Sequence, residues 1–368
     1  LPVCRELGIK YFVTDAGWYR DDERDWNSLG DWLANEKYFP GGLGEYVRAC
    51  RGHGMRAGVW FEFESVSLDS EIAREHPELL LTLDGKTIVH GNRAMLDFRK
   101  AETRAYLEER VIGLLLATGI RYIKIDYNEN VGMGVDGAES PCEGLRQHTD
   151  AVLAFYRELE EKVPDLVVEM CSSGGMRHEP LWLSLGSMCS FSDAHEGPEG
   201  AVVACDLHRF ISPRKLQIWA TIRDDYDEND TYFTVAKSML GRMCLSGNLA
   251  GRTENICRAI REGIAFYERI KGVVKSGETI KIARENITYL RNIHGVQTLT
   301  RLSEDGTKLL WYCFVIGKPG AQVQTRVPEG FVLTDHYGNA KVMQEGNAIV
   351  LTAAKADMVG CVALLEKK

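Results

Sequence analysis

The feature that most restricts the fold of this chain is an alternation of short apolar segments with longer amphipathic ones, which continues to about residue 277. Apolar runs of strand length, such as "LQIWATI" from Leu216, alternate with stretches of helical periodicity, such as "AETRAYLEERVIGLLLATG". This pattern is typical of βα units and predicts a parallel sheet. Eight strands close a (β/α)8 TIM barrel of about 250 residues, whereas a doubly wound open sheet is the alternative. The eight strand candidates begin at Ile9, Arg56, Ala94, Arg121, Leu166, Ser187, Leu216 and Gly241.

A different pattern follows Gly277, where apolar and polar residues alternate in short runs such as "ITYLRNI", "KLLWYCFVIG" and "AIVLTA". Turn signals, including Asp305-Gly306 and Pro319-Gly320, separate these runs. Such runs predict an antiparallel β domain. We therefore expect a catalytic barrel over residues 1–277 and a small antiparallel β-sandwich domain over residues 278–368.

Charge and composition exclude several classes of partner. The net charge is -9 and no dense run of Lys and Arg occurs, which argues against a nucleic-acid surface. No apolar run approaches the roughly 20 residues that a membrane helix needs. Ten cysteines form no CxxC pair, and several, such as Cys189, stand in apolar runs. Because buried reduced thiols fit a reducing compartment and the N-terminus does not resemble a signal peptide, we expect a cytoplasmic location.

Polar and aromatic residues recur where the predicted barrel strands end. In a (β/α)8 barrel the active site forms at the carboxyl ends of the strands, so residues there carry more functional weight than residues elsewhere. Acids, aromatic residues and a few cations all belong to this predicted rim. The residues in question are Asp15, Trp18, Trp60, Glu62, Glu64, Asp97, Lys124, Asp126, Asn128, Glu169, Cys171, Arg177 and Asp193.

The strand "YIKIDYN" places two charged residues where a buried parallel strand normally carries apolar ones. Side chains alternate along a strand, so Lys124, Asp126 and Asn128 share one face. An adjacent cation favours the ionised form of a carboxyl group, and we therefore expect Lys124 to keep Asp126 ionised. An ion pair that serves packing alone is the alternative.

A second carboxylate, Asp193, follows the apolar segment "MCSF" and has no neighbouring cation in the sequence. Desolvation would raise its pKa, which suits a proton donor. Two carboxylates in a pocket with aromatic walls are what glycoside cleavage requires, one as nucleophile and the other as acid. Trp18 and Trp60 could form such a wall, and ordinary core packing is the alternative for each.

Other chemistries are less well supported by the sequence. "GMGVDG" (residues 132–137) matches GxGxxG, but no clear helix start follows it, so a mobile loop is the preferred interpretation over a dinucleotide site. Lys124 could form a Schiff base in an aldolase-type barrel. No cluster of His, Cys and Asp has metal-ligand spacing, and "SSGG" is not a GxSxG elbow. We expect neither a metal nor another cofactor.

Taken together and in order, these motifs resemble those of glycoside hydrolase family 36, the melibiase-type α-galactosidases. "YIKIDYN" resembles the family's K-W-D-x-N nucleophile strand, "EMCSSGGMR" its E-N-C-A-S-G-G-G-R strand end, and "FSD" the S-D that carries the acid/base. "GVWFEFESVS" resembles G-L-W-F-E-P-E-M, and "VTDAGW" resembles D-D-G-W. The resemblance covers residues 8–280, and the later β domain fits the family's C-terminal sheet.

The resemblance implies a retaining exo-α-glycosidase that acts on terminal α-galactosides or a close relative through a covalent glycosyl-aspartate. Asp126 would be the nucleophile and Asp193 the acid/base, and no cofactor would take part. The partner would be a small α-linked oligosaccharide or glycoside, and a homo-oligomer is compatible with the resemblance. Residues expected to line the sugar subsite by position are Asp15, Trp60, Lys124, Asn128, Cys171 and Gly174, joined by Trp18 and Arg177 from the predicted rim.

Several departures from the family pattern bear on specificity. Ala16 replaces the second aspartate of D-D-G-W, which is expected to help hold the galactose 4- and 6-hydroxyls. The arginine before the third strand falls on Gly91, and we expect Arg93 to substitute for it. The family's N-terminal β-sandwich is not in this sequence. A transglycosylase of the same family and a non-catalytic sugar-binding relative are therefore the alternative functions.

Overall fold

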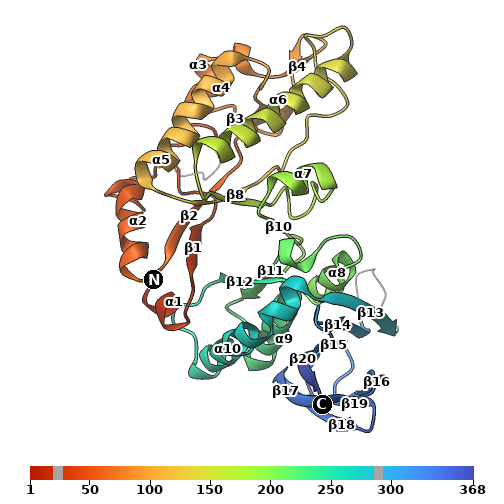
Figure 1. The fold of residues 1–368 in the computed structure, drawn as a ribbon. Coiled ribbons are helices and arrows are strands. Elements are labelled where there is room, and N and C mark those ends of the chain that lie inside the picture. Colours follow the sequence, from red (N-terminus) through yellow and green to blue (C-terminus); the bar gives the residue numbers. More distant parts are fainter. Residues whose placement is uncertain (20–27, 286–292) are drawn as a thin grey trace. The chain divides into compact units, whose positions relative to one another are not determined.

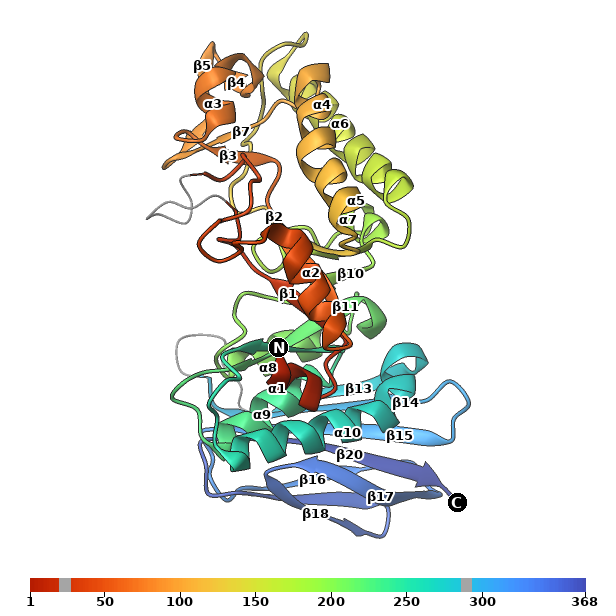
Figure 2. The same cartoon turned by 90° about the vertical axis from the view of Figure 1, so that its left-hand side faces the viewer.

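The computed structural model of the chain describes residues 1–19, 28–285 and 293–368 (Figures 1 and 2). These residues form two compact units, Leu1–Ser187 and Met188–Lys368. The predicted strand "ITYLRNI" lies outside the described residues except for its last position.

Four parallel strands form the centre of the first unit. They are β1 (Tyr11–Thr14), β2 (Arg56–Phe61), β8 (Tyr122–Ile125) and β9 (Val167–Met170), and they lie in this order. Every residue of β8 is buried, which explains its Tyr and Ile residues but makes Lys124 exceptional. Trp60 is paired with Lys124 in register, so the ends of β2 and β8 lie side by side.

The predicted third barrel strand, "AMLDF", is not found in the parallel sheet. Its first residues belong to β7 (Arg93–Met95), which pairs antiparallel with β3 (Ser65–Ser67) and β6 (Val89–His90). The physical reason is that β2 pairs directly with β8, from Val59 opposite Ile123 onward, which leaves no place for a strand between them. The segment instead follows the chain that leaves β2, where the Leu96 N–H donates to the Glu64 carbonyl at 2.9 Å.

Helices and short hairpins complete the first unit. The long amphipathic segment after β7 forms one continuous helix whose middle part is a π-helix, and this helix lies beside α6 (Pro141–Lys162) in Figure 1. Phe63 and Phe98 each pack edge to face against Phe155 of α6. The elements are α1 (Pro2–Glu6), α2 (Gly42–Gly52), α3 (Glu71–Glu75), η1 (Pro77–Leu79), β4 (Thr82–Leu83), β5 (Lys86–Thr87), α4 (Ala101–Leu107), η2 (Glu108–Gly113), α5 (Leu114–Thr118), α6 (Pro141–Lys162) and α7 (Pro180–Leu185).

The second unit begins with three further parallel strands, β10 (Met188–Ser190), β11 (Leu216–Ile222) and β12 (Arg242–Gly247). Between them lie α8 (Glu199–Leu207), η3 (Pro213–Lys215) and α9 (Glu228–Ser238), and α10 (Glu254–Ser276) follows β12. Asp227 caps α9 by accepting from the Asp230 N–H, while the Asp230 carboxylate accepts from the Asp227 N–H. This capping box fixes where α9 starts.

Two antiparallel sheets follow α10, as the alternating pattern predicts. One has the strand order β13-β14-β15-β20-β17 and the other β16-β19-β18. Trp311, Ile349 and Val359 belong to the apolar core of this region. The strands are β13 (Glu278–Glu285), β14 (Gly295–Leu302), β15 (Lys308–Ile316), β16 (Gln322–Arg326), β17 (Phe331–Gly338), β18 (Ala340–Glu345), β19 (Ala348–Ala353) and β20 (Met358–Lys367).

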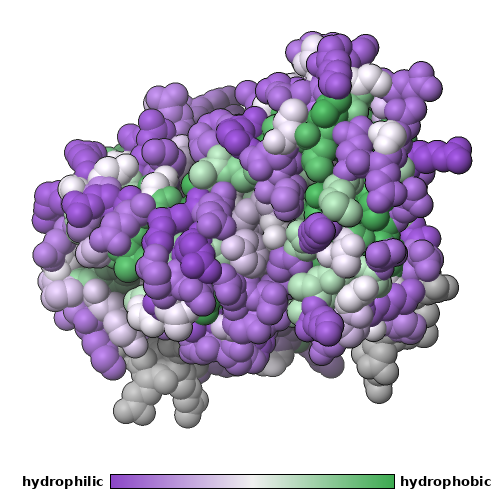
Figure 3. All heavy atoms as spheres, turned by 90° about the horizontal axis from the view of Figure 1, so that it is seen from below, coloured by the Kyte–Doolittle hydropathy of each residue, from purple (hydrophilic) through white to green (hydrophobic). Residues whose placement is uncertain are grey.

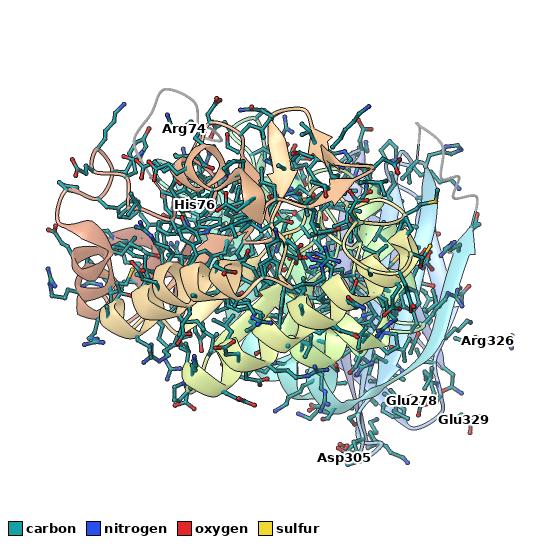
Figure 4. All side chains as sticks on the ribbon, turned by 90° about the horizontal axis from the view of Figure 1, so that it is seen from above. Arg74, His76, Glu278, Asp305, Arg326 and Glu329 are labelled. Atoms are coloured by element: carbon teal, nitrogen blue, oxygen red, sulfur yellow. The ribbon has the colours of Figure 1, made fainter. Side chains whose placement is uncertain are left out.

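Polar residues, including those of the predicted turns, lie on the surface of the molecule. Hydrophilic residues cover most of the face drawn in Figure 3. Asp305, labelled in Figure 4, lies in the predicted turn between β14 and β15 and accepts hydrogen bonds from the Ser303 hydroxyl at 2.6 Å and the Thr307 N–H at 3.0 Å. Across the described ranges, no helix combines the length and apolar character that crossing a membrane requires.

Candidate active site

Asp126 lies directly after β8, and three N–H donors converge on its carboxylate. The Trp60 indole donates to Oδ2 at 3.1 Å, and the backbone N–H groups of Tyr127 and Ser173 donate to Oδ1 at 3.0 and 2.8 Å. The Asp126 N–H donates to the Phe61 carbonyl at 2.7 Å, which continues the ladder between β2 and β8. Asp126 is only 8% exposed, so these bonds hold the carboxylate in one orientation.

The sequence predicts that Lys124 and Asp126 share one face, but β8 ends at Ile125 and the lysine forms an ion pair with Asp15. The ammonium lies 2.9 Å from Asp15 Oδ2, and the lysine is buried while the Asp15 side chain is 65% exposed. Burial would lower the pKa of the ammonium, but three neighbouring acidic groups outweigh burial and raise that pKa overall. These groups are Cys171, Asp15 and Glu169. Lys124 therefore anchors an exposed carboxylate at the end of β1.

Glu62 is the centre of a second buried network; the sequence placed it on the predicted rim but not among the residues expected to line the sugar subsite. Arg93 Nη1 lies 3.1 Å from both of its carboxylate oxygens, and the Asn128 side chain donates to Oε2 at 2.7 Å. The Ser65 hydroxyl and the Asn128 N–H both donate to Oε1. Burial raises the Glu62 pKa, while Arg93 and the bonds from Asn128 act in the opposite direction. The signal in the sequence was the two-residue spacing from Trp60, which places both side chains on one face.

The segment after β9 brings a backbone donor to Asp126. The Cys171 N–H donates to the last carbonyl of β8 at 2.8 Å, and Cys171 is buried. Ser172, Ser173 and Gly174 then have φ values of 53°, 50° and 77°. Left-handed backbone costs an L-residue roughly 1–2 kcal/mol, so this run is strained at both serines. Ser173, which donates to Asp126, was also missing from the expected site residues.

Trp18 and Trp60 are both 1% exposed, so neither presents an open aromatic wall. The Trp18 indole donates to the Trp60 carbonyl at 2.6 Å, and its ring packs against Tyr19, Trp32 and Phe61. The structure therefore places Trp18 in an aromatic core. Trp60 has a different position because its indole N–H reaches Asp126.

Arg177 lies in a buried ion pair with Glu64. Its guanidinium donates to Glu64 Oε1 at 2.6 Å and to Oε2 at 2.8 Å, a bidentate geometry. The Tyr127 and Trp182 rings both lie 3.8 Å from the guanidinium carbon, and the Tyr156 hydroxyl also donates to Glu64. These contacts bind the Arg177 guanidinium to Glu64 within the first unit, and Arg177 is only 8% exposed.

Asp193 follows β10 in the second unit, and its side chain is exposed. The residues before it are buried: Cys189 and Ser190 are 0% exposed and Phe191 is 1% exposed, and the Phe191 N–H donates to the Gln217 carbonyl at 3.1 Å. The expected desolvation of Asp193 is therefore wrong, because the apolar segment "MCSF" turns into the core before the chain reaches the carboxylate.

The glycine-rich segment at residues 132–137 is fixed by hydrogen bonds to a hairpin. The Asp136 carboxylate accepts from the Asp84 N–H at 3.0 Å and the Gly85 N–H at 2.8 Å. The next helix, α6, begins only at Pro141. A phosphate site needs a helix N-terminus directly after the loop, so this segment lacks the geometry of a dinucleotide site. In the part of the chain that the structure describes, no group of three or more His, Cys, Asp and Glu side chains is arranged to hold a metal ion.

Sequence comparison identifies relatives for most of the chain. The Melibiase family model matches residues 2–277. Alpha-galactosidase AgaA of Geobacillus stearothermophilus is 32% identical over 286 residues, which are 74% of this chain and 38% of that protein. Probable alpha-galactosidase C of Aspergillus terreus is 32% identical over 367 residues, 93% of this chain and 47% of the relative. The chain thus spans less than half the length of these two curated relatives.

Solved structures confirm the fold. The GH36 α-galactosidase AgaA from Geobacillus stearothermophilus, solved in a substituted form with raffinose, superposes with a TM-score of 0.85 at 20% identity, covering 100% of this chain and 52% of that one. The fold class is that of a TIM barrel followed by an antiparallel β domain, and the described residues supply seven parallel strands of the barrel. The resemblance to glycoside hydrolase family 36 that the motifs indicate is confirmed, and the chain belongs to the Melibiase family.

Proposed function

We propose that this chain carries the catalytic residues of a retaining exo-α-glycosidase that hydrolyses terminal α-galactosides or closely related α-glycosides. The relatives named above are α-galactosidases, and one of them holds raffinose in its solved structure. The observation that carries the proposal is the convergence of three N–H donors on Asp126 at the carboxyl end of β8.

Asp126 is the nucleophile in this proposal. Its Oδ1 accepts two backbone N–H bonds, whereas Oδ2 accepts the single bond from Trp60. Oδ2 therefore has the freer lone pair and attacks the anomeric carbon. The bond from that carbon to the leaving oxygen breaks, and an ester bond to Asp126 forms.

Asp193 is the acid/base. In its protonated form it gives its proton to the departing oxygen, so that the leaving group departs as an alcohol. The resulting Asp193 carboxylate then takes a proton from a water molecule, whose oxygen attacks the anomeric carbon and displaces Asp126. The exposed position of Asp193 suits exchange of this proton with solvent. No step requires a cofactor.

Asp15 is the most accessible of the expected sugar-binding residues. Its carboxylate is anchored by Lys124 yet 65% exposed, so it can accept hydrogen bonds from sugar hydroxyls. Ala16 cannot add a second carboxylate at this position. We therefore infer a weaker demand for the galactose 6-hydroxyl, which a comparison of α-galactosides with β-L-arabinopyranosides tests, because the latter lack the hydroxymethyl group.

The test of the nucleophile uses Asp126→Ala, an activated aryl α-galactoside and azide. Azide should replace the missing carboxylate and yield the β-galactosyl azide, whereas Asp193→Ala with azide should yield the α-azide through the intact glycosyl-enzyme. Unchanged turnover by Asp126→Ala would exclude Asp126 as nucleophile.

Product analysis at high acceptor concentration separates hydrolysis from transglycosylation. Sugar binding by calorimetry without turnover of any α-glycoside would instead indicate a non-catalytic protein.

Two further expectations remain proposals. We propose that residues 1–277 form the barrel and residues 278–368 the β domain, which is supported by the change from parallel to antiparallel strands after α10. We also propose a reducing, cytoplasmic location, supported by the burial of Cys50, Cys205, Cys313 and Cys361. A third proposal is that the protein forms a homo-oligomer, and light scattering of the purified protein would measure its molar mass and so test this.

A further inference from the structure

Lys237 in α9 is a fully buried lysine, 0% exposed, that has no part in the mechanism above. Its ammonium donates to the backbone carbonyl of His195 at 2.5 Å. His195 lies two residues after Asp193, in the loop between β10 and α8. Burying an ammonium group costs free energy unless the group is paired and hydrogen-bonded, so the contacts of Lys237 bear on what it does.

The same loop is held by several other contacts from its own unit. The His195 ring forms a 2.6 Å hydrogen bond with the Thr221 hydroxyl and packs edge to face on Trp219, both on β11. The neighbouring Glu196 accepts from Arg223 through its carboxylate and from Tyr226 through its carbonyl. These contacts reach the loop from β11 and the segment after it, whereas Lys237 reaches it from α9.

Space for the lysine depends on Gly200, the second residue of α8. A Cβ atom at that position would lie 3.2 Å from both Cδ and Nζ of Lys237 and 3.0 Å from the Ala194 carbonyl. The ammonium also lies 5.8 Å from the centre of the Phe191 ring. Loop, helix start and lysine are therefore packed as one group around the residues that flank Asp193.

We propose that Lys237 is a positioning residue that fixes the loop carrying Asp193 and thereby orients the acid/base carboxyl group. This inference rests on the proposed role of Asp193. Lys237 does not act on the sugar itself, because its ammonium is buried and bound to a backbone carbonyl. Burial lowers the pKa of Lys237 to about 7, opposed by the carboxylates of Glu199 and Glu196, so the lysine is held at an energetic disadvantage.

The test compares two substrates in Lys237→Met. 2,4-Dinitrophenyl α-galactoside has a leaving group that departs without protonation, whereas raffinose needs the proton from Asp193. Because general acid catalysis contributes about 10²–10⁴-fold, we expect kcat/KM on raffinose to fall about tenfold or more and kcat/KM on the dinitrophenyl substrate to fall less than about threefold. Lys271→Met, on the exposed face of α10, is the control and should leave both values unchanged.

Equal losses on the two substrates, or no loss on either, would overturn the proposal, since a purely structural role affects both alike. Gly200→Ala, which keeps the lysine but presses on its ammonium, should show the same selective loss. If Lys237→Met does not fold, Gly200→Ala decides in the same way. Asp193→Ala separates the two proposals. If this variant loses kcat/KM selectively on raffinose but the Lys237 and Gly200 variants do not, only the positioning role is overturned. Absence of the selectivity in Asp193→Ala would overturn the assignment of the acid.

Discussion

The indole N–H of Trp60 donates to Asp126 Oδ2 at 3.1 Å, although 66 residues separate the two in the chain. Hydrogen bonds to charged groups contribute about 1.5–3 kcal/mol. We therefore expect Trp60→Phe, which keeps the ring but loses the donor, to lower kcat/KM on an aryl α-galactoside by about tenfold or more. Steady-state kinetics of the purified variant measure this loss.

Trp32→Phe is the matched control for that change. The Trp32 ring belongs to the same aromatic cluster, but its indole N–H has no hydrogen-bond partner among the described residues. Trp32→Phe should therefore retain the kcat/KM of the unmodified protein. Equal losses in the two variants would show that ring packing, and not the bond to Asp126, sets the activity.

Ser173 donates to Asp126 through its backbone, at a φ of 50°. We expect Ser173→Gly to retain kcat/KM because glycine adopts this backbone conformation without strain and keeps the N–H. Ser173→Val should lose about tenfold or more, since a β-branched residue resists positive φ and would move the donor. A large loss in Ser173→Gly would mean that the hydroxyl itself takes part.

The buried pair Arg177–Glu64 is expected to stabilise the first unit without serving the chemistry. Arg177→Met leaves Glu64 as a buried unpaired charge, so the free energy of unfolding should fall by about 3–5 kcal/mol. Adding Glu64→Gln should recover much of the loss. Arg146→Met, which removes an exposed pair with Glu143, should leave stability essentially unchanged in the same urea titrations. Full stability of Arg177→Met would contradict this assignment.

Lys237 should make stability depend on pH with a definite sign. Below pH 7 it is protonated in both states, and the folded state bears the full cost of the buried charge. Between about 7 and its ordinary value of 10.5 only the unfolded state retains the proton, so this group adds stability as pH rises. Lys237→Met removes the effect.

The gain in unfolding free energy from Lys237→Met should therefore be larger at pH 6 than at pH 9. Each pKa unit corresponds to about 1.4 kcal/mol, so the difference should reach a few kcal/mol. Urea titrations of both proteins at the two pH values provide the measurement. The same gain at both would mean that Lys237 does not change its protonation in this range.

Strand and helix positions were predictable because the underlying patterns are local. β8 and β11 lie where their apolar runs predict, and β15 and β19 match the predicted runs "KLLWYCFVIG" and "AIVLTA" after Gly277, whereas β13 was not predicted. The two-residue period predicts a shared face for Lys124 and Asp126, although β8 itself ends at Ile125. The third strand was wrong because pairing of β2 with β8 depends on the whole sheet and not on the apolar run in "AMLDF".

Partners of the charged residues could not be predicted for a related reason. Lys124 pairs with Asp15, 109 residues earlier, and Arg177 with Glu64, 113 residues earlier. Strand register determines which acid pairs with which base. The sequence predicted an interaction between Lys124 and Asp126 because the two residues are close in the chain. The Ser173 donor depends on a left-handed backbone that its residue type does not favour, so only the structure could reveal it.

The antiparallel strands are bound directly to the helices that precede them. The Tyr312 hydroxyl donates to the Met239 carbonyl at 3.0 Å, the Tyr337 hydroxyl to the Ala259 carbonyl at 2.9 Å, and Arg301 Nε to the Val273 carbonyl at 2.9 Å. Expression of a fragment ending at residue 277 would uncover the apolar faces of α9 and α10 and invite aggregation. A minimal recombinant fragment should therefore retain the sheets, even though the proposed nucleophile and the proposed acid/base both lie upstream of them.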